Sequence, residues 1–231
     1  MSRDHSSAAE AVTEATTTSE GECGGISNIR RTRGDGNCFY RAFIYGYLEQ
    51  IVRRKDASEA KKARACLREW GSRLKDHGFQ EIVYEDALAE IISQLDMIVE
   101  GTMSLDNLLQ THNNPEIGNY IIMLLRFITS SALQTREEFF APFVVAVTES
   151  VSDVTQFCRQ CVEPMGEESD HAHIIALTDA LKGNDRRLFG VERAEKCRVG
   201  LCRSTEHARD QNIGVRPASL CREGVVDFVS N

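Results

Sequence analysis

The sequence lacks a long hydrophobic run, a surplus of basic side chains and an apolar leader, and each absence excludes a class of protein. No run of 18 or more apolar residues occurs, so no transmembrane helix and no membrane partner are predicted. Acidic side chains (35) outnumber Lys and Arg (27), which argues against a nucleic-acid partner, because phosphates attract a basic face. Residues 1–20 contain four acidic side chains and no signal-peptide core, so the expected location is the cytoplasm, with the nucleus as a second compartment.

What the sequence does contain is enough apolar material for one domain, together with eight cysteines. Hydrophobic residues make up 42% of the 231 residues, which excludes a wholly disordered chain. In a reducing compartment, cysteines act as thiols, metal ligands or nucleophiles rather than as a disulfide framework. The sequence therefore directs attention to the chemical context of each thiol.

Composition divides the chain into three parts. Residues 1–28 are rich in Ser, Thr, Ala, Glu and Gly without an apolar period, which predicts a disordered tail; a partner-docking arm is the alternative. Residues 29–182 carry helical patterns and form the predicted domain. Residues 183–231 contain eight arginines and short apolar clusters without a period, and only Val225–Val229 resembles a strand.

The middle part predicts a layer of helices. Phe39, Phe43, Tyr47 and Ile51 mark one face of a helix that begins near Cys38, and apolar residues from Leu88 to Ile98 mark another. Pro115 fits the first turn of a third helix. The remaining predicted helical segments are Ala57–His77, Phe139–Val147, Val154–Val162 and a last one capped by Ser169 or Asp170.

The strongest chemical signal is the stretch of residues 31–43. Gly34-Asp35-Gly36-Asn37 predicts a tight turn, and the helix that follows begins at about Cys38. A thiol at the first position of a helix lies at the positive end of the helix dipole, which favours the thiolate. The peptide N–H groups of the turn could also face a developing oxyanion. The alternative is a glycine turn followed by a buried structural cysteine.

Three stretches resemble a known family. Residues 34–43 look like the nucleophile motif of cysteine peptidases of the OTU superfamily, which remove ubiquitin. Residues 119–129 and 162–174 resemble otubains, a subgroup of that superfamily, and their sequence is most similar to that of plant members. The resemblance extends from about Ile29 to Leu181, and the three motifs stand in the family's order.

The resemblance implies a fold, an activity and a set of site residues. The fold is α+β and papain-like, with a helix-rich first part beside a central sheet. The activity is thiol-dependent hydrolysis of isopeptide bonds at the C-terminal glycine of ubiquitin. Cys38 matches the nucleophile, Asp35 matches the acid of the loop, and Gly36 and Asn37 match the residues that support the oxyanion. No cofactor and no metal are implied; the implied partners are ubiquitin, polyubiquitin conjugates and ubiquitin-conjugating E2 enzymes.

The sequence departs from the family after Leu181. Otubains supply a base histidine from a late strand in a Gly-His-aromatic-Asp context, and none of the six histidines here follows a glycine. His207 is late but has no aromatic neighbour, so the base is unassigned; His171 and His173 match a helical segment, where packing or capping is expected. The expected late strands are also missing, which predicts an incomplete sheet. A shifted reading frame or a retained intron is one hypothesis for this tail.

Two further interpretations of these residues remain. A zinc site could be suggested by Cys158, Cys161, His171 and His173. The two histidines of a His-x-His pair on a helix point to opposite sides, and their spacing is not that of a zinc finger, so no metal site is predicted.

The functional alternatives are an active deubiquitinating peptidase and a catalytically impaired ubiquitin- or E2-binding protein, or a mis-spliced product without the histidine. Turnover is expected to be weak, because a base both activates the thiol and protonates the leaving group.

Overall fold

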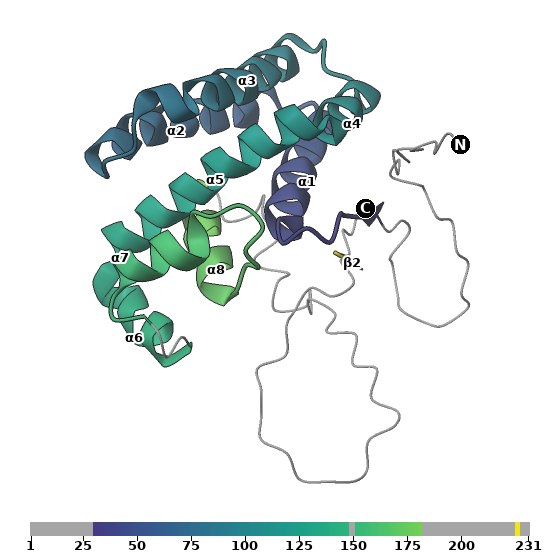
Figure 1. Cartoon of the computed structure of the whole chain (residues 1–231). Coiled ribbons are helices and arrows are strands. Elements are labelled where there is room, and N and C mark those ends of the chain that lie inside the picture. Colours follow the sequence, from purple (N-terminus) through teal and green to yellow (C-terminus); the bar gives the residue numbers. More distant parts are fainter. Residues whose placement is uncertain (1–29, 148–150, 182–224, 227–231) are drawn as a thin grey trace, which may run out of the picture.

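The computed structural model describes residues 30–147, 151–181 and 225–226, and these are mostly helical (Figure 1). None of the helices in this part of the chain is long and apolar enough to cross a membrane. Two short strands lie near the start and the end of the chain. The elements in chain order are β1 (Arg30–Arg31), α1 (Cys38–Arg54), α2 (Ala57–Asp76), α3 (Glu81–Glu100), α4 (Leu105–Asn113), α5 (Pro115–Thr135), α6 (Glu137–Val147), α7 (Val154–Phe157), the π-helical turn η1 (Cys158–Val162), α8 (His171–Leu181) and β2 (Val225–Val226).

Helix α5 lies at the centre of the molecule. It runs between the α2–α3 pair and the group formed by α6, α7 and α8 (Figure 1), and it contacts each of these elements as well as α1, α4 and η1. Its apolar residues Ile121, Leu124, Leu125 and Ile128 are fully buried or nearly so. Because α5 contacts both ends of the molecule, a side chain on it can reach the start of α1 and the segment before α8.

Local sequence signals explain most of the helix boundaries. Helix α1 begins at Cys38 as predicted, and it ends where Lys55 adopts a left-handed conformation, with φ of 52°. Pro115 occupies the first turn of α5, and the side chain of Asn114 caps that helix. Asp170 rather than Ser169 caps α8, because its Oδ1 accepts from the backbone N–H groups of Ala172 and His173.

Two segments differ from the sequence-based expectation. Helix α4 was not predicted; Ser104 caps it by accepting from the Asn107 N–H at 3.1 Å, and Leu108 is its one buried residue. The predicted helix Val154–Val162 is divided into α7 and a π-helical turn. In that turn the N–H of Glu163 donates to the carbonyl of Cys158 at 2.9 Å, a bond that spans five residues.

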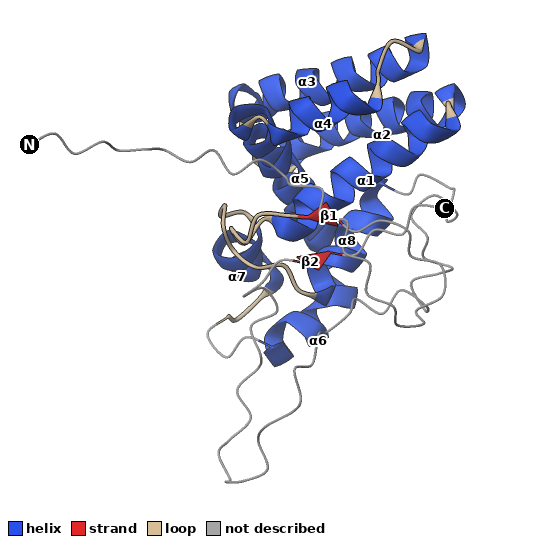
Figure 2. Cartoon of the chain, turned by 90° about the vertical axis from the view of Figure 1, so that its right-hand side faces the viewer, coloured by secondary structure: helices blue, strands red, loops and turns tan. Residues whose placement is uncertain are grey.

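The sheet in the described part of the chain is one antiparallel pair of two-residue strands (Figure 2). Arg30 pairs with Val226, and Arg31 pairs with Val225. The prediction of a strand near Val225 is therefore confirmed for two residues. The predicted tail of residues 1–28 and nearly all of the predicted divergent tail of residues 183–231 lie outside the described residues. The larger central sheet therefore stays a prediction.

Candidate functional site

The turn before α1 places a thiol at a helix N-terminus. Cys38 is the first residue of α1 and is 4% exposed. The turn is closed by Asp35, whose Oδ1 accepts from the backbone N–H of Asn37 at 3.1 Å. Because that N–H is bonded within the turn, it is not available to an oxyanion. The predicted tight turn and the predicted start of the helix at Cys38 are thus both present.

Asn37 stands at the N-cap of α1 without acting as a cap. An asparagine at this position usually accepts a hydrogen bond from an N–H group of the first turn, but here no such bond is made. Its Oδ1 accepts instead from the N–H of Gly166 at 3.1 Å and from Arg126. Its Nδ2 donates to the carbonyl of Asp35 at 3.3 Å. The side chain of Asn37 therefore supports the turn, and it leaves the first-turn N–H groups of α1 without a cap from this residue.

Two glycines allow the turn to lie against the segment that precedes α8. Gly36 has a φ of 73° and Gly166 a φ of 89°, both in the left-handed region that glycine tolerates. A Cβ atom on Gly36 would lie 1.8 Å from the carbonyl oxygen of Gly166. No other residue fits at position 36 without displacing one of the two segments.

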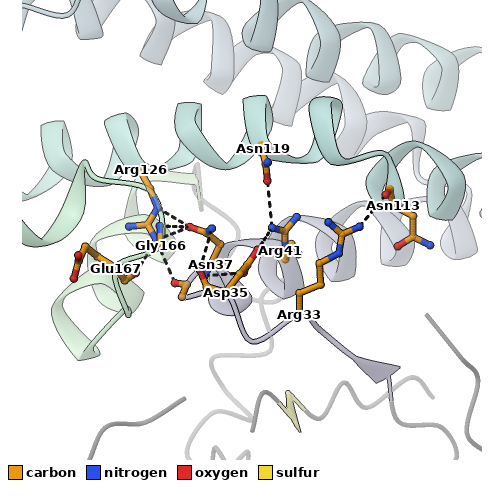
Figure 3. Close-up of polar contacts among 10 residues, drawn as sticks. Arg33, Asp35, Asn37, Arg41, Asn113, Asn119, Arg126, Gly166 and Glu167 are labelled. Atoms are coloured by element: carbon orange, nitrogen blue, oxygen red, sulfur yellow. Dashed lines mark hydrogen bonds and ion pairs between the residues drawn. The ribbon is translucent and has the colours of Figure 1, made fainter. Parts of the chain in front are cut away.

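Arg126 of α5 joins the same two segments. It is 0% exposed, and Figure 3 shows its guanidinium group between the turn and the segment that contains Gly166. It donates to Oδ1 of Asn37 at 2.7 Å and to the carbonyls of Gly36 (3.2 Å), Val162 (2.9 Å) and Glu167 (2.7 Å). Burial lowers the pKa of Arg126, and the nearby Tyr40, Glu167, Asp35 and Cys38 oppose that shift. Arginine stays protonated in proteins, so this is a buried positive charge bonded to the turn that precedes Cys38.

Arg41 secures the acid of the turn from the other side. Its Nη2 forms an ion pair with Oδ2 of Asp35 and donates to Oδ1 of Asn119 on α5 at 3.2 Å (Figure 3). Arg33 adds a link from the same approach to the carbonyl of Asn113 at 3.1 Å. Asp35 is thus held by a bond within the turn and by a cation of α1.

Three of the four described histidines lie within hydrogen-bonding distance of groups other than the Cys38 thiol. Nδ1 of His173, which is 1% exposed, lies 2.7 Å from Oδ1 of Asp170, and its Nε2 lies 3.3 Å from the carbonyl of Cys161. His173 therefore takes part in the cap and packing of α8, the role expected for it. Nε2 of His112 lies 3.0 Å from Oε1 of Gln94, and burial, with Arg41 nearby, lowers the pKa of His112 to about 4.

The other histidines leave the base unassigned. His77 lies 3.2 Å through its Nε2 from Oγ1 of Thr135, and His171 is exposed. His207, the one late histidine, lies outside the described residues.

The remaining cysteines sit in structural surroundings. Cys158 is buried and its thiol donates to the carbonyl of Ser130 at 3.6 Å; burial raises its pKa to about 12. Cys161 and Cys66 are half-buried, and burial raises the pKa of both thiols. Within the described residues, no group of three or more His, Cys, Asp or Glu side chains is arranged to hold a metal ion.

The site contains three residues to which the sequence assigned no role. Arg126, Arg41 and Gly166 all fall inside the stretches that carry the family resemblance, but nothing in their local pattern shows what they bond. Their partners lie up to 129 residues away. A charged residue within the apolar stretch of α5 is the one signal that could have indicated Arg126, since a buried arginine needs acceptors.

Comparisons with known proteins agree with this geometry. The sequence model described as peptidase C65, otubain, matches residues 5–201. The "OVARIAN TUMOR DOMAIN-containing deubiquitinating enzyme 1" of Arabidopsis thaliana is 42% identical over 156 residues, which are 66% of this chain and 50% of that protein. Human "Ubiquitin thioesterase OTUB1" is 40% identical over 158 residues, which are 67% of this chain and 55% of that protein.

Solved structures show the same relationship in three dimensions. A chain in "The structure of a ceOTUB1 ubiquitin aldehyde UBC13~Ub complex" has a TM-score of 0.61 and 34% identity, and the match covers 68% of this chain and 60% of that one. A chain in "The structure of h/ceOTUB1-ubiquitin aldehyde-UBCH5B~Ub" gives the same TM-score and identity, with 59% of its length covered. The chain spans about half the length of the curated relatives it matches.

Proposed function

Because this chain belongs to the otubain family of peptidases, we propose that it is a deubiquitinating cysteine peptidase with Cys38 as its nucleophile. The observation that carries the proposal is the position of the thiol. Cys38 begins α1, directly after a turn that Asp35, Asn37 and Arg126 hold in place. None of the other described cysteines combines a helix N-terminus with such a turn.

The proposed reaction is acyl transfer to the thiol. The Sγ of Cys38 attacks the carbonyl carbon of the C-terminal glycine of ubiquitin, and the π electron pair of the C=O bond moves onto oxygen. The thiol gives up its proton as the S–C bond forms. When the carbonyl re-forms, the C–N bond to the lysine breaks, and the amine takes up one proton as it leaves. Water then cleaves the thioester and regenerates the thiol. The N–H groups at the start of α1, which the Asn37 side chain does not cap, are the proposed donors to the oxyanion.

The proposed partners are ubiquitin, polyubiquitin conjugates and E2 enzymes. The related structures named above are complexes with ubiquitin aldehyde and with UBC13~Ub or UBCH5B~Ub. Those partners belong to the related proteins, and a match over two thirds of this chain supports their extension to it. The proposed location is the cytoplasm, with the nucleus as a second compartment.

Labelling with a ubiquitin probe tests the nucleophile. The purified chain is incubated with ubiquitin that carries a C-terminal electrophile, and the adduct is measured by intact mass. We expect an adduct with the wild-type chain and none with Cys38→Ala. Cys161→Ala, which removes a thiol that is more exposed than that of Cys38, is the matched control and should label like the wild type. Equal labelling of Cys38→Ala would refute the assignment.

A specific observation keeps the impaired form of the protein as the second candidate. Nε2 of His77, Nε2 of His112 and both ring nitrogens of His173 lie within hydrogen-bonding distance of other groups, and the base is unassigned. We therefore expect the chain to form the probe adduct but to cleave diubiquitin slowly at neutral pH, because lysine leaves poorly without a proton donor. Rapid cleavage of diubiquitin would contradict this expectation and favour the fully active peptidase.

A further inference from the structure

The charge of Arg126 has no carboxylate partner among the ion pairs of the described residues. Burying a charge without compensation is costly, so its acceptors must be well placed. They are four oxygen atoms, three of them backbone carbonyls, and the guanidinium group also lies 4.6 Å from the centre of the Tyr40 ring. An apolar side chain at this position would avoid the free-energy cost of removing a charge from water. The arginine is therefore better explained by the segments that it holds in position than by a gain in stability.

The acceptors belong to two segments that are far apart in the sequence. Gly36 and Asn37 lie in the turn before α1, while Val162 is the last residue of η1 and Glu167 lies in the loop between η1 and α8. A lysine could not replace Arg126 here, because the guanidinium group offers a planar fork of donors and an ammonium group is a single point. One side chain of α5 thus bonds both segments, in addition to the direct bond from the Gly166 N–H to Asn37.

We propose that Arg126 is a positioning residue that holds the turn in the geometry required for an oxyanion to form at the start of α1. The inference rests on the proposed function, since it concerns the acyl-transfer step. Arg126 does not touch the substrate in this proposal. It acts through Gly36 and Asn37, whose placement fixes the N–H groups that follow them. A shift of about 1 Å in such groups can cost about 100-fold in rate.

Two reagents separate this role from a structural one. Ubiquitin aldehyde reacts by forming a bond between Sγ and the carbonyl carbon while the C=O electron pair moves to oxygen, which then takes up a proton. Iodoacetamide reacts by displacement of iodide and forms no oxyanion. In Arg126→Lys we expect adduct formation with ubiquitin aldehyde to slow by about 10- to 100-fold. Alkylation of Cys38 by iodoacetamide should change by less than about threefold, because it needs no oxyanion donors.

The chain offers a matched control on the same stretch. Arg136, the residue after α5, is exposed and forms an ion pair of 2.7 Å with Asp179. Arg136→Lys should leave both reactions at wild-type rates. If Arg126→Lys does not fold, as judged by circular dichroism, Asn37→Ala replaces it. That variant removes the side-chain link to Arg126 and to Gly166 but leaves the guanidinium group with three carbonyl acceptors.

The outcomes decide whether Arg126 has the proposed positioning role or a purely structural one. A selective loss of the aldehyde reaction in Arg126→Lys or Asn37→Ala supports the inference. Equal rates with ubiquitin aldehyde in wild type and variant, or equal losses with both reagents, overturn it. A wild-type chain that iodoacetamide alkylates at Cys38, but that forms no adduct with ubiquitin aldehyde, refutes the proposed function itself and the inference with it.

Discussion

At the scale of single residues, the close approach of Gly36 to Gly166 carries a sharp prediction. Gly36→Ala places a Cβ 1.8 Å from a backbone oxygen and forces an alanine to a φ of 73°. The left-handed conformation alone costs about 1–2 kcal/mol, and the clash adds to it. We expect the free energy of unfolding in urea to fall by about 2 kcal/mol or more, with loss of probe labelling at Cys38.

Gly34 provides the matched control for that substitution. It lies in the same turn, and a Cβ built on it has no atom within 4 Å. Gly34→Ala should therefore keep wild-type stability within about 0.5 kcal/mol. If both variants behave alike, the close packing of the two segments does not control the turn.

At the scale of elements, His112 links α4 to α3 and to α1. It bonds Gln94 of α3, its ring lies 5.9 Å from the Tyr45 ring of α1, and its folded pKa of about 4 lies below the usual value of 6.5. Between those two values the unfolded chain binds a proton that the folded chain does not. The stability of the fold should therefore fall as the pH drops from about 6.5 towards 4, by roughly 2 kcal/mol.

Urea unfolding at several pH values between 4 and 7 measures the slope of the free energy of unfolding against pH. His112→Gln, which keeps a donor towards Gln94, should reduce this slope. His77→Gln leaves His112 in place and should retain it. A slope in His112→Gln equal to that of the wild type would show that other groups cause the acid sensitivity.

Elements also show what the sequence could and could not predict. The start of α1 at Cys38, Pro115 in the first turn of α5 and the Asp170 cap of α8 follow from short-range signals, so they were predictable. The role of Arg126 was not, because three of its acceptors are backbone carbonyls, which have no residue-type signature. The residues of the turn could be predicted, whereas the contacts that hold it are long-range.

At the scale of the whole molecule, the β1–β2 pair joins residues that lie almost 200 positions apart. It places Arg30 and Arg31 next to Val226 and Val225, close to the approach to the turn (Figure 2). Arg30 is held there as well by an ion pair of 2.6 Å with Glu49 of α1. So short a ladder adds little to global stability, but it restricts the chain just before the turn.

Limited proteolysis with trypsin tests that restriction. The double variant Val225→Pro, Val226→Pro removes the N–H groups that β2 can donate, so we expect cleavage after Arg31 and Arg33 to become several times faster. The double variant Val225→Thr, Val226→Thr keeps strand-forming residues and should resemble the wild type. Cleavage within α2 gives an internal reference. If the proline variant is cut at the wild-type rate, the ladder does not protect this approach.

The contacts of Arg126 with the turn and with the loop before α8 also have a consequence during synthesis of the chain. The ribosome produces Cys38 early, Arg126 some ninety residues later, and the acceptor carbonyl of Glu167 another 41 residues after that. Until the segment around Gly166 has left the ribosome, the contacts of Arg126 are incomplete and the turn has no Gly166 to pack against. A nascent chain shorter than this carries the thiol without these contacts, so, on the proposed role of Arg126, Cys38 becomes able to react with ubiquitin only late in synthesis.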